Sequence, residues 1–142
     1  MGAATVLMAS GEELPENVKV IIADCGYTSE WDEFKCEANA LHIPWFPVLN
    51  AASVMSRLRD GYDFKQASAL EQVKQSRIPT LFIHGSDDEL VPYSMLDKLY
   101  SAAACEKECL TVDGAGHALS SSVEPELYWN TVESFIDKYL EK

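Results

Sequence analysis

The chain has 142 residues, of which 47% are hydrophobic and 24% are charged, a composition typical of one globular domain with a real core. Its formal net charge of -12, from 23 acidic against 11 basic residues, repels nucleic acid and anionic lipid, so we expect neither as a partner. No apolar run approaches the roughly 20 residues that a bilayer span needs. The N-terminus also lacks the layout of a secretory signal, so we expect a cytoplasmic protein without a membrane partner.

Three segments are predicted to form strands. Residues 18–23 and 80–83 are nearly continuous in β-branched and apolar residues, which is typical of strands buried on both faces of a parallel sheet. Residues 108–112 are more mixed and suit a strand nearer a sheet edge. Apolar residues at helical spacing predict helices over residues 95–103 and 128–140. This alternation of strands and helices favours an α/β layered fold with three mainly parallel strands and right-handed crossovers.

Three hydroxyl-x-x-acid patterns, which begin at Ser29, Ser68 and Ser94, predict helix starts. The segment from about residue 31 to residue 64 lies between the first two strands and is longer than a plain crossover needs. We expect it to add one or two helices on top of the sheet as a lid-like insertion, because α/β proteins place ligand-facing elements there.

The aromatic residues in and beside this insertion are the candidates for an apolar pocket wall. They are Tyr27, Trp31, Trp45 and Phe46. Ordinary packing of the inserted helices is the alternative.

The four cysteines are expected to be reduced and mostly buried thiols, because no export signal accompanies them. Cys105 and Cys109 are spaced so that one helical face could present both thiolates. No second Cys/His pair follows at metal spacing, so we expect no metal site and no cofactor.

An acid and a base each follow a predicted strand. Asp88 lies in the motif His-Gly-Ser-Asp-Asp-Glu-Leu-Val-Pro after the second strand, where a carboxylate can hold an imidazole in one tautomer. Taken alone, Asp87 or Asp88 would instead make an Asx turn toward the next helix. His117 follows the third strand through the flexible loop Asp-Gly-Ala-Gly and can act as a general base. His84 is expected to be buried and bonded to the backbone.

The motifs H-G-S-D-D-E-L-V-P and G-A-G-H, with M-G-A-A-T at the front, resemble the C-terminal half of a bacterial α/β-hydrolase. More narrowly, they are similar to the serine-aminopeptidase and prolyl-oligopeptidase-like hydrolases, and the resemblance covers essentially the whole chain as one partial α/β-hydrolase domain. It implies a triad acid at Asp88, with Asp87 as the alternative, and a triad base at His117. Met1 would follow the nucleophile and donate its backbone N–H in the oxyanion hole, and Gly2 would end the G-x-S-x-G elbow.

The G-x-S-x-G motif itself does not occur in the sequence, and we expect the chain to begin just after the nucleophile serine. Ser120, Ser121 and Ser122 follow His117, but they are expected to begin the last helix rather than to stand on a strand-to-helix turn. The resemblance implies a serine hydrolase that acts on a small-molecule ester, thioester or amide and needs no cofactor.

Two alternatives belong to other classes of protein. The first is a catalytically inactive fragment or interaction module, which would self-associate through the first strand where a neighbouring strand is expected. The second is a small doubly wound domain of receiver or flavodoxin type, which also has acids at strand ends. Receivers have an acid cluster at an early strand and flavodoxins an early hydroxyl-rich loop, and the sequence has neither.

Overall fold

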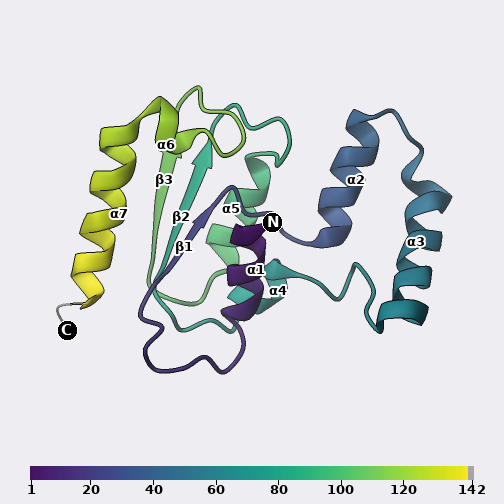
Figure 1. Cartoon of the computed structure of the whole chain (residues 1–142), viewed down its shortest axis with the longest axis horizontal. Coiled ribbons are helices and arrows are strands. Elements are labelled where there is room, and N and C mark those ends of the chain that lie inside the picture. The colour runs from purple at the N-terminus through teal and green to yellow at the C-terminus, as the bar shows by residue number, and fades with distance from the viewer. Residues whose placement is uncertain (141–142) are drawn as a thin grey trace.

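The computed structural model describes residues 1–140 and contains one parallel sheet flanked by helices (Figure 1). The strands lie in the order β1 (Ile21–Asp24), β2 (Thr80–Gly85) and β3 (Lys107–Val112). Ile21 pairs with Thr80, which in turn pairs with Lys107. The predicted α/β fold with parallel strands is therefore confirmed, and the three strands all end at the same side of the molecule.

β2 and β3 match their predicted burial, but β1 does not. β2 is buried at every position because it lies between the other two strands, and burial alternates at the end of β3. β1 was expected to be buried on both faces, yet buried and half-buried positions alternate along it, because it lies at an edge of the described sheet. β1 begins at Ile21 rather than at the predicted Val18. Pairing starts where β2 starts, directly after Pro79, whose carbonyl accepts the Ile21 N–H at 2.9 Å.

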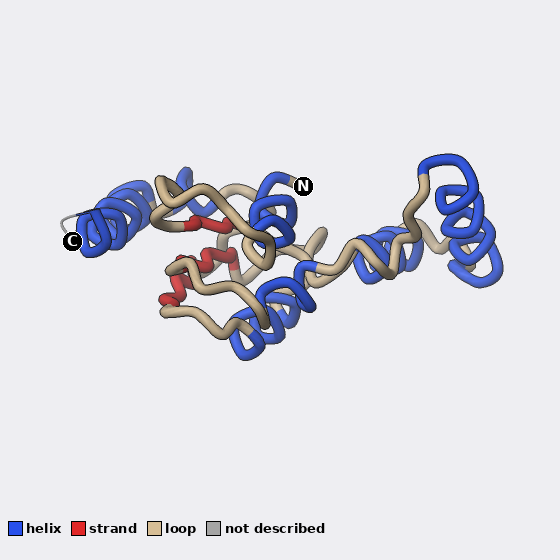
Figure 2. Tube along the Cα trace, turned by 90° about the horizontal axis from the view of Figure 1, so that it is seen from below, coloured by secondary structure: helices blue, strands red, loops and turns tan. Residues whose placement is uncertain are grey.

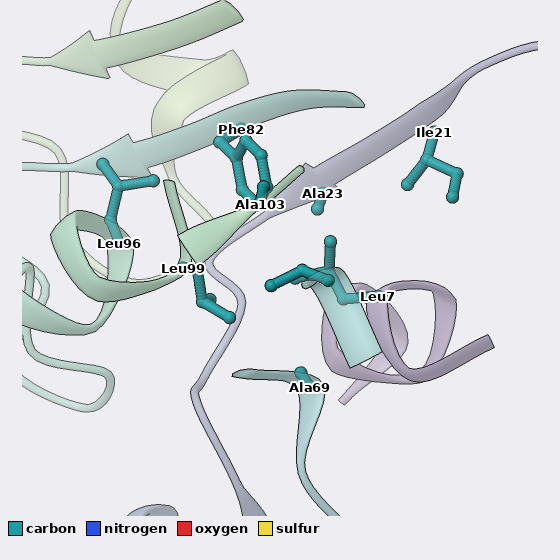
Figure 3. Close-up of a cluster of buried hydrophobic side chains, with 9 residues drawn as sticks. Leu7, Ile21, Ala23, Ala69, Phe82, Leu96, Leu99 and Ala103 are labelled. Carbon is teal, nitrogen blue, oxygen red and sulfur yellow. The ribbon is translucent and has the colours of Figure 1, made fainter. Parts of the chain in front are cut away.

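Helices cover both faces of the sheet. On one face lie α1 (Gly2–Ala9), α4 (Ala69–Val73) and α5 (Ser94–Ala102), and on the other lies α7 (Pro125–Leu140). Successive β2 side chains point to opposite faces, so one core gathers around Phe82 (Figure 3) and the other around its neighbours in β2. The first core contains Leu7, Ile21, Ala23, Ala69, Val73, Phe82, Leu96, Leu99 and Ala103, and the second Leu81, Ile83, Leu110, Val112, Ala115, Val132 and Phe135.

Two of the three predicted helix caps form. Ser29 and Ser68 each accept a backbone N–H in the first turn of the helix that follows. Ser94 does not cap α5, which begins one residue early because the Met95 N–H bonds to the carbonyl of Pro92.

The serines after His117 do not begin the last helix as predicted. They lie in a separate short helix, α6 (Ser120–Val123), and α7 starts at Pro125. Proline has no N–H to donate and is favoured in the first turn of a helix.

The segment between β1 and α4 contains two helices, α2 (Glu30–Ala40) and α3 (Trp45–Asp60). They extend away from the sheet as an arm (Figure 2), and the rings of Trp31 and Trp45 meet edge to face with centroids 6.5 Å apart. A role for this arm as a lid stays a prediction.

The thiols differ in part from the prediction. None of the four cysteines is in a disulfide, but only Cys25 is buried, and Cys109 is exposed. Cys105 and Cys109 share no helix, because Cys109 lies within β3. Across residues 1–140 no helix combines the length and apolar character that a bilayer crossing requires.

Within the described chain β1 pairs with β2 alone, so its other edge presents unpaired backbone groups beside an apolar hollow of about 210 Å³. Val6, Ala9, Leu14, Val18, Val20, Ile21 and Ile22 line the hollow. Such an edge favours pairing with another chain.

We expect the isolated chain to self-associate through this edge, with an average mass that rises with concentration in sedimentation equilibrium. Val6→Lys adds a charge to the rim of the hollow at an exposed helical position and should shift the chain toward monomer. Val54→Lys, on the exposed surface of α3, is the matched control. A monodisperse wild-type monomer at all concentrations would contradict the expectation.

Candidate active site

Loops that follow the three strands meet at the carboxyl end of the sheet (Figure 1). Cys25 follows β1, Asp88 follows β2, and His117 follows β3. The β2 and β3 loops touch at Gly85, where an added Cβ would lie 2.1 Å from the carbonyl oxygen of Ala115. A glycine is therefore required at this position for the loop that carries His117 to approach β2.

The Asp88 carboxylate is buried, with 6% of the residue exposed, and its two oxygens have different partners. Oδ1 accepts the backbone N–H groups of Leu90 at 3.0 Å and Val91 at 2.9 Å. Oδ2 lies 2.9 Å from Nδ1 of His117. Asp88 thus makes the Asx turn and contacts the histidine at the same time, and its role as a triad acid stays a prediction.

Burial alone would raise the pKa of Asp88, but the N–H of Val91 and the bond to His117 outweigh it and lower that pKa. The carboxylate is therefore ionised at neutral pH. An ionised partner makes Nδ1 of His117 the donor and leaves Nε2 as the acceptor. Asp87 is exposed and accepts the Ser86 hydroxyl instead, so Asp88 is the acid that the structure pairs with His117.

His84 is completely buried, and its Nε2 lies 2.9 Å from the carbonyl of Val91. The prediction of a buried histidine bonded to backbone is confirmed. The same atom lies 3.4 Å from Oδ2 of Asp88, so His84 supports the turn that orients the acid.

A cavity of about 160 Å³ adjoins His117. Met1 and Tyr27 line it, as do four residues of one face of α2. The full lining is Met1, Tyr27, Glu30, Glu33, Phe34, Glu37, Leu90, Val91 and His117. The roles of Met1 in an oxyanion hole and of Tyr27 in a pocket wall stay predictions, and this position is compatible with both.

The other three predicted pocket residues lie elsewhere. Trp31 lines a separate hollow, where the Lys65 ammonium sits 4.3 Å from the ring centroid. Trp45 lines an apolar hollow of about 230 Å³ between α2 and α3, and Phe46 is 65% exposed.

Glu33 is a site residue that the sequence reasoning missed. It is only 8% exposed, and its Oε2 has no hydrogen-bond partner among the described residues. Burial, and then the nearby charge of Glu37, raise the pKa of Glu33 to about 7. The stripe of Glu30, Glu33, Phe34 and Glu37 at helical spacing was the available signal.

Cys25 was also missed. Its Sγ accepts the backbone N–H of Ala118 at 3.3 Å and lies 3.1 Å from Oδ1 of Asp24. Both Cys25 and Ala118 have φ of 56°, the left-handed region. Burial, reinforced by Asp24, raises the pKa of the Cys25 thiol to about 12, so this thiol keeps its proton and is a poor nucleophile.

The chain is similar to known proteins over almost its whole length. Residues 52–125, which include Asp88 and His117, match the family model described as serine aminopeptidase, S33. The uncharacterized protein YqkD of Bacillus subtilis is 30% identical over 138 residues, which are 96% of this chain and 45% of that protein. Alpha/beta hydrolase domain-containing protein 17C of Homo sapiens is 29% identical over 106 residues, 72% of this chain and 32% of that protein. The chain spans less than half the length of the curated relatives it matches.

Solved structures share the fold. The acylaminoacyl peptidase of Pyrococcus horikoshii superimposes with a TM-score of 0.70 at 16% identity, over 99% of this chain and 23% of that one. The Pyrococcus furiosus esterase PF2001 gives 0.69 at 16% identity, over 97% of this chain and 51% of that one.

A parallel sheet with an aspartate and then a histidine at its carboxyl end, together with these matches, defines an α/β-hydrolase. Within that superfamily the chain belongs to the S33 serine aminopeptidase family.

We expect Asp88→Asn to lower the free energy of unfolding by about 1–3 kcal/mol at neutral pH, because two buried N–H groups lose a charged acceptor. Since folding lowers the pKa of Asp88, its carboxylate stabilises the fold above the unfolded value of about 3.9. That contribution is lost as the pH falls through this value toward the lowered folded pKa. In urea unfolding, the difference in free energy of unfolding between wild type and Asp88→Asn should become smaller at acidic pH. Asp87→Asn, at the exposed neighbour, should show no such pattern.

For Glu33 we expect the opposite dependence of stability on pH. Because folding raises its pKa to about 7, ionisation destabilises the fold as the pH rises from the unfolded value of about 4.3 toward 7. Glu33→Gln should gain stability relative to wild type over this range, by about 2 kcal/mol in urea unfolding at mildly alkaline pH. Glu126→Gln, an exposed acid in the first turn of α7, is the control. If the difference in free energy of unfolding between Glu33→Gln and wild type were the same at acidic and alkaline pH, the assigned environment of Glu33 would be contradicted.

Proposed function

We propose that the chain supplies the acid and the base of a serine hydrolase that acts on a small ester, thioester or amide. The observation that carries this proposal is the contact between Asp88 Oδ2 and His117 Nδ1 at 2.9 Å, made beside a cavity by a carboxylate that two backbone amides hold in place.

The proposed chemistry follows from the tautomer of His117. Nδ1–H donates to Asp88, so Nε2 is free to accept the proton of an attacking serine hydroxyl. The serine oxygen bonds to the acyl carbon, and His117 returns the proton to the departing alcohol, thiol or amine. Water then repeats the sequence and releases the acid and the free serine. Asp88 stabilises the imidazolium that forms in each half.

We propose that the nucleophile is a serine encoded directly before Met1 in the coding sequence. The observation that supports this position is that Met1 lines the same cavity as His117. The backbone N–H of Met1 would then donate to the oxyanion.

The walls of the cavity favour one charge class of substrate. Three acidic residues, Glu30, Glu33 and Glu37, line it together with Tyr27 and Phe34. We therefore expect neutral or positively charged acyl groups to be accepted and anionic ones to be excluded. Because α2 provides this wall, we also propose that α2 and α3 together act as the lid.

We expect the protein expressed with its upstream coding sequence to be labelled by a fluorophosphonate at a serine directly before Met1 and to hydrolyse activated short-chain esters. His117→Ala and Asp88→Asn should each lower kcat/KM by about 10²–10⁴-fold. A neutral acyl ester should be hydrolysed faster than a succinyl ester of the same leaving group.

His42→Ala is the matched control, because His42 is exposed and lies outside the cavity. Activity that survives loss of His117, or labelling at a serine within residues 1–142, would refute the assignment. An upstream sequence without Gly-x-Ser in frame, and a protein that takes no label, would favour the inactive or interaction-module alternative.

A further inference from the structure

Cys25 joins Asp88 and His117 in a compact group of three different donor atoms. One sulfur, one oxygen and one nitrogen all lie within 4.8 Å of one another. Thiolate, carboxylate and imidazole are the ligands that zinc takes, and three protein ligands leave a fourth position open. We propose that Cys25, Asp88 and His117 bind a zinc ion, and that the bound ion blocks the base. The binding stands by itself, and the inhibition rests on the proposed hydrolase function.

The ligand atoms are held in place before any metal binds. Oδ1 of Asp88 is occupied by the amides of Leu90 and Val91, which leaves Oδ2 toward the group. The Cys25 backbone is fixed by the bond from its N–H to Ile83 O at 3.0 Å. Outer contacts of this kind orient metal ligands and raise metal affinity.

Binding requires small movements of the donor atoms, which lie within 4.8 Å of one another. The separation of 2.9 Å between Nδ1 of His117 and Oδ2 of Asp88 is that of a hydrogen bond. Ligands of tetrahedral zinc, at bond lengths of about 2.0–2.3 Å, lie roughly 3.3–3.8 Å apart. His117 can move outward by this amount because its side chain is 32% exposed and a glycine loop precedes it.

The local charge favours a cation. The Asp24 carboxylate lies 3.1 Å from the Cys25 sulfur, and Glu33 stands in the wall of the cavity that His117 lines. The Cys25 thiol gives up its proton to solvent when zinc takes its place.

Zinc on Nδ1 would move the remaining imidazole proton of His117 to Nε2. A protonated Nε2 cannot accept the proton of a serine hydroxyl. The bound metal thus selects the tautomer in which His117 is not a base, and it also removes the bond to Asp88.

Metal binding is tested on the chain itself by titration with cobalt(II), which takes zinc sites and reports thiolate ligation by a charge-transfer band in the near ultraviolet. We expect the band in wild type and its loss on addition of zinc. Cys25→Ser should abolish the band, and Cys109→Ser, at an exposed thiol, should keep it. His117→Gln, at a partly exposed position, should weaken the affinity at least about 10-fold. A band that survives in Cys25→Ser, or that is lost in Cys109→Ser, would overturn the site.

Inhibition is tested on the protein that carries its upstream sequence, with each variant compared with its own zinc-free rate. We expect zinc to inhibit wild type and Cys109→Ser alike, and Cys25→Ser to need at least about 10-fold more zinc for the same loss. If wild type, Cys109→Ser and Cys25→Ser were equally sensitive to zinc, inhibition through this site would be refuted. If the protein shows no hydrolase activity, the cobalt titration still decides whether the metal site exists. If the enzyme is labelled and active but shows no cobalt charge-transfer band, the metal site is refuted and the proposed hydrolase function stands.

Discussion

The candidate site depends on one carboxylate whose two oxygens have separate tasks. Oδ1 of Asp88 satisfies the amides of Leu90 and Val91, and Oδ2 holds His117. A buried anion is costly without such partners, so the turn after β2 and the orientation of the base form as one unit. His84 adds to this unit from within the sheet, because it bonds to the carbonyl of Val91.

The same carboxylate explains how much of the site could be predicted from the sequence. Asp88 and His117 are visible because each follows an apolar run that becomes a strand, and strand ends in a parallel sheet meet at one side. The choice between Asp87 and Asp88 needed the structure. Neighbouring residues in a turn point in different directions, and only the coordinates show that Asp87 is exposed.

Other parts of the site depend on contacts that carry no local signature. Cys25 reaches the site through a bond from Ala118, a residue distant in the sequence, and both have left-handed backbones that nothing in their side chains requires. Aromatic residues were expected to form the pocket, yet Trp31 and Trp45 pack on one another in the arm. The position of β2 was predictable because this strand is buried on both faces. The start of β1 was not predictable, because the pairing of Ile21 with Thr80 determines it.

The cap at Ser29 has a consequence for the polarity of the cavity. Its hydroxyl accepts the N–H of Asp32, and Thr28 donates to the Asp32 carboxylate at 2.6 Å, so the first turn of α2 is fixed from two sides. A helix turns by about 100° per residue, and a start displaced by one position would rotate Glu33 out of the wall and bring a different stripe of α2 inward. Two hydroxyl groups directly before α2 therefore set its axial rotation, and with it which of its side chains stand in the wall of the cavity that His117 lines.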